Sequence, residues 1–124
     1  MSDAESLPRA AVLPLVVPLP AEIDAANAGT VAARLAEALR RGADMVLADM
    51  SATTFCDTAG LRVLIRAGRQ AAANGTGLWL LSPSPAILRV MKVHGVGGAL
   101  PVCPRLEEAL AAASRRTHPG QAAV

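Results

Sequence analysis

Short apolar runs and segments of helical periodicity alternate four times along this chain of 124 residues, and this pattern constrains its fold more than any other feature. Four runs have the length and composition of buried strands: residues 11–17, 44–50, 77–82 and 99–103. Each run precedes a segment in which apolar residues recur at three- and four-residue steps: residues 27–41, 61–74, 85–94 and 105–116. Such alternation favours an α/β domain with largely parallel central strands.

Local signals predict where several of these elements begin and end. Ser84 offers a capping hydroxyl directly before Pro85, and proline is favoured at the first position of a helix. The Asn74-Gly75 pair predicts the end of the second helix. Pro14 lacks an amide hydrogen, so we expect the first strand to lie at a sheet edge or to contain a bulge.

Composition limits the size of the domain and its classes of partner. With 52% hydrophobic residues the chain can bury one core, which we expect over residues 10–116, between a flexible N-terminus (1–9) and a disordered tail (117–124). The net charge of +2 is spread along the sequence, and only two residues are aromatic. Nucleic-acid binders concentrate positive charge on one face or stack bases on aromatic rings, so we expect no nucleic-acid partner.

The cysteines and the N-terminal region point to a cytoplasmic protein without a metal. Cys56 and Cys103 form neither a CxxC pair nor a zinc pattern, so reduced thiols are expected. The first six residues are acidic and polar, unlike a signal peptide, and the apolar stretch 10–21 is short and contains three prolines. We therefore expect no membrane insertion. The chain has no phosphate-binding glycine motif, so no cofactor is expected.

The most informative segment is residues 46–65, where a buried strand, a polar loop and a helix follow one another. Thr58 falls at the first turn of that helix, where unpaired N–H groups and the helix dipole favour a phosphate. Phosphorylation there would add about −1.5 to −2 charge beside Asp57. Gly60 would let a partner approach closely. Alternatively, Asp57 and Thr58 form an ordinary helix cap, and Gly60 is a small residue where the helix crosses the sheet.

Other residues near this segment leave alternatives open. Asp24 could contact a partner or be a solvated loop carboxylate, and Asp49 could lie near Thr58 or accept hydrogen bonds from the following loop. Cys56 adjoins Thr58, but a free cysteine is more often an inert buried residue than a redox switch. No histidine or lysine lies beside Thr58 in the sequence to activate its hydroxyl, so we do not expect an enzyme.

The chain resembles STAS domains (sulfate transporter and anti-sigma factor antagonist) over about residues 10–113. The matching segments are residues 22–24, 46–51, 55–61 and 82–95. The run Asp57-Thr58-Ala59-Gly60-Leu61 is similar to the family's Asp-Ser/Thr-x-Gly-Leu signature, in which the hydroxyl residue is the phosphoacceptor. Two departures are the threonine, where serine is common, and the run 20–22, where many members have glycine before the acidic residue.

The resemblance implies a single STAS-like domain, a mixed β-sheet with about four helices packed on one side. It also implies an anti-sigma factor antagonist that binds a histidine-kinase-like serine/threonine kinase, is inactivated by phosphorylation on Thr58 and is reset by a phosphatase. The implied partner-binding residues are Asp24, Asp57, Thr58, Ala59, Gly60 and Leu61. STAS domains also occur as accessory subunits of lipid-transport ATPases and as scaffolds of stress complexes, which is the alternative function.

Overall fold

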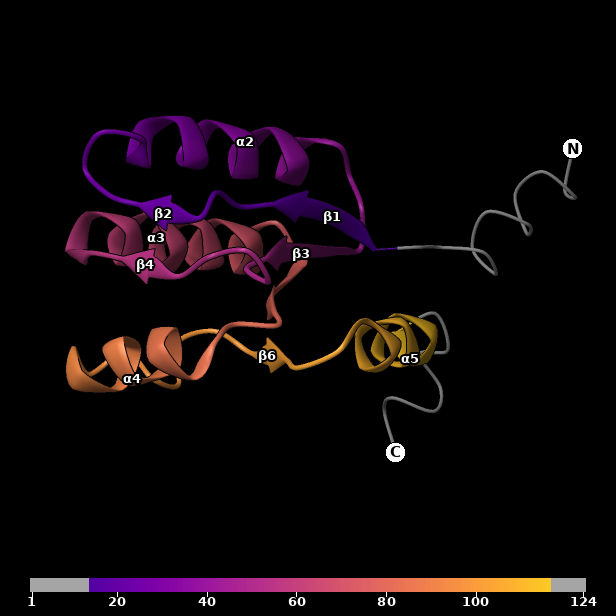
Figure 1. The fold of residues 1–124 in the computed structure, drawn as a ribbon. Coiled ribbons are helices and arrows are strands. Elements are labelled where there is room, and N and C mark those ends of the chain that lie inside the picture. Colours follow the sequence, from indigo (N-terminus) through magenta and orange to yellow (C-terminus); the bar gives the residue numbers. More distant parts are fainter. Residues whose placement is uncertain (1–13, 117–124) are drawn as a thin grey trace, which may run out of the picture.

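The computed structural model describes residues 14–116, and it confirms the predicted α/β class (Figure 1). Its elements follow in the order β1 (Leu15–Pro18), β2 (Glu22–Ile23), α2 (Ala28–Arg40), β3 (Met45–Asp49), β4 (Phe55–Cys56), α3 (Thr58–Ala73), β5 (Gly77–Leu81), α4 (Pro85–Val93), β6 (Val102–Cys103) and α5 (Leu106–Arg116). The predictions for residues 1–9 and 117–124, and for the start of the first strand, lie outside the described residues.

The main sheet has four strands in the order β1-β3-β5-β6, and each neighbouring pair is parallel. β1 lies at one edge, as Pro14 predicted. A second, two-stranded sheet joins β2 to β4, again in parallel, and neither of these short strands was predicted. Over residues 14–116 all strand pairs are therefore parallel, which differs from the mixed sheet that the resemblance implied.

Alternating side chains on the central strands divide the core into two layers. On β3, Val46 and Ala48 face the larger core, which also holds the buried sides of α2, α3 and α4. Met45 and Leu47 face the opposite layer, where they meet Ala109 of α5. Three helices thus cover one face and α5 covers the other. The expectation that all helices lie on one side was wrong for α5, because both faces of β3 are apolar and require a cover.

The helix ends confirm the local signals. The Ser84 hydroxyl accepts a hydrogen bond from the Ile87 amide at 3.2 Å, with Pro85 at the first position of α4. Gly75 follows α3 with a φ of 74°, a left-handed conformation that favours glycine. α3 itself begins at Thr58, before the predicted apolar pattern starts at 61, because the polar cap precedes the first apolar residue.

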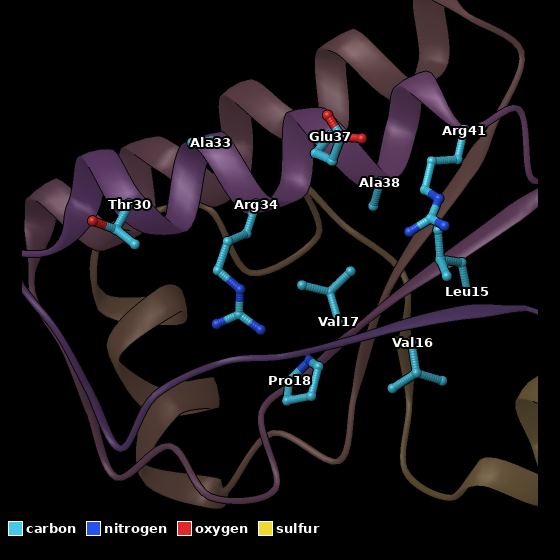
Figure 2. A pocket seen from close by; sticks show the side chains of 10 residues that line it. All are labelled: Leu15, Val16, Val17, Pro18, Thr30, Ala33, Arg34, Glu37, Ala38 and Arg41. Atoms are coloured by element: carbon cyan, nitrogen blue, oxygen red, sulfur yellow. The ribbon is translucent and has the colours of Figure 1, made fainter.

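A groove of about 400 Å³ runs along the outer side of β1 (Figure 2). Its floor is apolar and includes Val17 from the strand and Ala38 from α2, and the guanidinium groups of Arg34 and Arg41 flank it. The groove contains none of the residues predicted for the functional site. It lies between the edge strand β1 and α2.

Candidate phosphoacceptor site

Asp57 fixes the turn that presents Thr58. Its backbone is extended, with φ −91° and ψ −173°, and its carboxylate accepts a hydrogen bond from the Gly60 amide at 3.0 Å. The first helical hydrogen bond runs from the Leu61 amide to the Asp57 carbonyl at 2.9 Å. Asp57 is thus the N-cap of α3, and Thr58 occupies the first helical position, where its side chain is exposed. Asp57 therefore caps the helix, and the hydroxyl of the neighbouring Thr58 stays exposed.

The small β2–β4 sheet anchors this turn to a distant part of the chain. Ile23 pairs with Cys56, and the Asp57 amide donates to the Ile23 carbonyl at 3.0 Å. Asp24 and Asp57 therefore follow the ends of two adjacent parallel strands, although 33 residues separate them in the sequence. The structure brings these two predicted residues to one edge of the small sheet, together with Thr58.

Asp24 stabilises the start of the α2 segment. Its carboxylate accepts hydrogen bonds from the amides of Ala26 at 3.0 Å and Asn27 at 3.3 Å. In return, the Asn27 side chain accepts from the Asp24 amide at 2.9 Å and donates to the Glu22 carbonyl at 2.7 Å. This half-buried carboxylate holds the loop beside the site in one conformation.

The residues after Thr58 lead into the core. Ala59 is half-buried, and Gly60 and Leu61 are buried. A Cβ atom on Gly60 would lie 2.6 Å from the Cys56 Sγ and 2.8 Å from the Ile23 Cγ2, so glycine is needed for close packing of α3 on the small sheet. Within the run 57–61, Thr58 is the residue with an exposed side chain, whereas Gly60 and Leu61 are buried below it.

Cys56 is buried and poorly suited to redox chemistry. Desolvation by burial, and secondly the negative charge of Asp57, raise the pKa of its thiol to about 11. The thiolate is the reactive form, and at neutral pH it is scarce at this pKa.

Asp49 has a local role, because its carboxylate accepts a hydrogen bond from the Ser51 amide at 2.9 Å in the loop after β3.

A cavity of about 320 Å³ opens beside Thr58, and sequence reasoning missed it. Its lining is Thr58, Leu61, Arg62, Ile65, Arg66 and Arg69 of α3, with His94 and Val96 from the segment after α4. The arginines recur at four- and three-residue steps, which places them on one side of α3 and was visible in the sequence. The apposition of residues 94–96 with α3 was not visible, because it depends on the tertiary fold.

Phe55 is the second feature that the sequence did not reveal. It stands three residues before Thr58 and is 50% exposed, an unusual position for one of only two aromatic residues. Exposed aromatic side chains next to well-ordered backbone are frequent anchors of protein interfaces. Its neighbour Cys56 faces the core because β4 alternates its side chains.

Two further observations concern residues 14–116. No cluster of three or more histidine, cysteine or acidic side chains in this range could hold a metal ion. No helix in this part of the chain has both the length and the apolarity needed to cross a membrane.

Several solved structures share this fold. A protein from Thermotoga maritima, proposed to be an anti-sigma factor antagonist, superimposes with a TM-score of 0.69 at 19% identity, over 79% of this chain and 86% of that chain. The anti-sigma factor antagonist SpoIIAA in its unphosphorylated form gives a TM-score of 0.64 at 24% identity, over 79% of this chain and 85% of that chain. SpoIIAA, a Bacillus cell fate determinant, also has a structure in its phosphorylated form, at 25% identity and a TM-score of 0.58, over 77% and 86% of the two chains.

A sulfate transporter family protein from Wolinella succinogenes has the same fold, with a TM-score of 0.64 at 20% identity over 81% of this chain and 84% of that chain. No curated protein matches the chain in sequence. The family model of the STAS domain matches residues 3–109, which include every element from β1 to α4 and the whole site around Thr58. The chain therefore belongs to the STAS domain family.

Proposed function

We propose that this protein is an anti-sigma factor antagonist that binds an anti-sigma factor kinase in the cytoplasm and is inactivated by phosphorylation on Thr58. The observation that carries the proposal is the exposed hydroxyl of Thr58 at the first position of α3, directly after the capping carboxylate of Asp57. Membership of the STAS family supports it, as does the fold shared with SpoIIAA, which exists in unphosphorylated and phosphorylated forms.

The proposed modification uses chemistry that the partner supplies. A base of the kinase accepts the Thr58 hydroxyl proton while the oxygen attacks the γ-phosphorus of ATP. The bond between that phosphorus and the bridging oxygen breaks, and ADP leaves. This protein contributes a positioned acceptor and performs no catalysis. A phosphatase then hydrolyses the phosphothreonine and restores the binding form.

The contact surface in this proposal combines Thr58 with its exposed neighbours. Phe55 offers an exposed apolar anchor three residues before Thr58, and the arginine-lined cavity opens beside Thr58. The carboxylates of Asp24 and Asp57 each fix their own loop, and the pairing of β2 with β4 places the two loops side by side. A phosphate on Thr58 would stand in the middle of this surface, where its bulk and charge act directly on a bound partner.

The test is affinity capture from the native host with wild type, Thr58→Ala and Thr58→Glu, followed by mass spectrometry of partners and of residue 58. We expect wild type and Thr58→Ala to capture a histidine-kinase-like protein, Thr58→Glu to capture much less, and phosphate to appear on wild-type Thr58. Thr30 supplies a matched control because it is also exposed in the first turn of a helix, so Thr30→Glu should leave capture unchanged.

Recovery of the subunits of a transport ATPase or a scaffold, with Thr58 unmodified, would refute the antagonist function. It would instead support an accessory role for this STAS domain. Equal capture by Thr58→Glu and wild type would also contradict the proposal, because it would show that charge at position 58 does not control the interaction.

A further inference from the structure

The cavity beside Thr58 carries an unusual concentration of unpaired positive charge. Arg62, Arg66 and Arg69 are all exposed, and within residues 14–116 none of their side chains takes part in a hydrogen bond or an ion pair. The ion pairs described in this range involve Arg40 and Arg105 instead. The cavity lining contains no carboxylate. The three guanidinium groups therefore have no acidic partner within this lining.

Helix geometry directs one of these arginines toward Thr58. Residues four apart lie on the same side of a helix, about 6 Å apart along the axis, and side chains lean toward the N-terminus. Arg62 is four residues after Thr58, and both line the same cavity. An anion placed N-terminal to a cation at this spacing is the more favourable of the two orders.

The segment after α4 contributes His94 and Val96 to the lining of the cavity. The His94 Nδ1 lies 3.0 Å from the Val90 carbonyl oxygen, and because a carbonyl only accepts, this nitrogen carries the hydrogen. In the neutral ring the Nε2 atom is then an acceptor and offers no hydrogen to an anion, so the arginines are the anion-binding groups of this cavity. Leu61 forms part of the apolar floor and is buried. An anion in this cavity would meet exposed guanidinium groups beside the buried side chain of Leu61.

We propose that the Thr58 end of the arginine-lined cavity is a phosphate site for the protein's own phosphothreonine, with Arg62 as the partner of a phosphate on Thr58. The proposal rests on Thr58 being the acceptor and adds what the phosphate does next. Phosphorylation then has two effects on the contact surface. It introduces a dianion, and it occupies a guanidinium group that is otherwise unpaired.

The test measures the phosphate directly and requires no kinase. Phosphothreonine is incorporated at position 58 during synthesis of the full chain, and its second pKa, ordinarily about 6, is followed by ³¹P NMR. A neighbouring guanidinium stabilises the dianion and lowers this pKa. We expect Arg62→Gln to raise it by at least about 0.3 pH unit, as for an exposed pair at this spacing.

Arg69→Gln is the matched control. It removes the same charge from the same helix and cavity, but at about 16 Å along the axis from Thr58 it lies beyond the screening length at physiological salt. We expect this variant to leave the phosphate pKa unchanged. His94 and Asp57 are retained in both variants.

Equal pKa values in wild type and Arg62→Gln, or equal shifts in the two variants, would overturn the proposal. Either result is independent of the proposed function, because the phosphate is installed chemically and the partner is absent. A confirmed ion pair in a protein that the host never phosphorylates would overturn the function and leave the site intact. Both arginines are exposed, so neither substitution should prevent folding.

Discussion

Replacing Gly60 with alanine should destabilise the protein even though alanine is the better helix former. An ideal Cβ at this position lies 2.6 Å from the Cys56 Sγ and 2.8 Å from the Ile23 Cγ2. Favourable contacts between such atoms need about 3.5–4.0 Å, so α3 or the small sheet must shift by about 1 Å. Ile23 is fully buried and Cys56 is 3% exposed, which leaves neither side chain an open space to enter.

The expected magnitude combines two opposing contributions. Overpacking a close-fitting core costs about 1–3 kcal/mol, and the gain from alanine over glycine within a helix is at most about 1 kcal/mol. We expect Gly60→Ala to lower the free energy of unfolding by about 1–2 kcal/mol. Gly29 in α2 is the control, since a Cβ there meets no atom within 4 Å, and Gly29→Ala should be neutral or stabilising by about 0.5 kcal/mol.

Urea unfolding followed by the fluorescence of the single tryptophan, Trp79, and by circular dichroism gives both values. A double-mutant cycle locates the cause: Cys56→Ala removes the nearer of the two contacts, so the cost of Gly60→Ala should fall by about 1 kcal/mol in that background. A Gly60→Ala protein as stable as wild type that nevertheless loses its partner would refute the packing explanation. It would show that Gly60 serves the approach of a partner.

Two other predictions concern the same turn. Asp57→Ala should lower the free energy of unfolding by about 1 kcal/mol because the Gly60 amide loses its cap, whereas Asp57→Asn should retain most of it; equal losses in urea unfolding would contradict the capping role. For Cys56, the raised pKa of about 11 means that the folded state holds its thiol proton more tightly than the unfolded chain. The free energy of unfolding should therefore not change with pH near neutrality. Between pH 9 and 11 it should fall by up to about 1.4 kcal/mol per pH unit relative to that of Cys56→Ala. Labelling of Cys56 by a thiol reagent at pH 7 should require unfolding.

The helix ends could be predicted because their determinants are local. Ser84 caps α4 with a hydrogen bond to an amide three residues away, and Gly75 adopts a left-handed conformation directly after α3. Both signals lie within four residues of the structure that they specify. The strands of the main sheet were also recognisable, because β3 is buried on both faces and its sequence is continuously apolar.

The small sheet could not be predicted in the same way. β2 and β4 each have two residues, too few to show a period, and each has one exposed and one buried side chain. Their pairing joins Ile23 to Cys56 across a long stretch of chain. It is this pairing that explains why Gly60 must lack a side chain. The sequence therefore indicated the signature 57–61 but not what the glycine contacts.

The cavity beside Thr58 shows a second limit. The spacing of Arg62, Arg66 and Arg69 was present in the sequence, yet such a stripe is usually a solvated helix face. What distinguishes it is a cavity whose described lining has no acidic residue, and the contribution of His94 from another segment to that lining. Both are properties of the fold. The placement of α5 on the second face depended similarly on which side of β3 remained uncovered.

Exposed and buried residues alternate through this segment in a way that separates recognition from stability. Phe55, Thr58 and Arg62 present their side chains to solvent, whereas Cys56 of the small sheet and Gly60 of α3 are buried against each other. A phosphate on Thr58 would therefore replace no core contact, and the N-terminus of α3 would stabilise it. The phosphorylated protein should keep its fold while the charge of its contact surface changes. Under the proposed function, phosphorylation of Thr58 would then release a partner without the cost of unfolding.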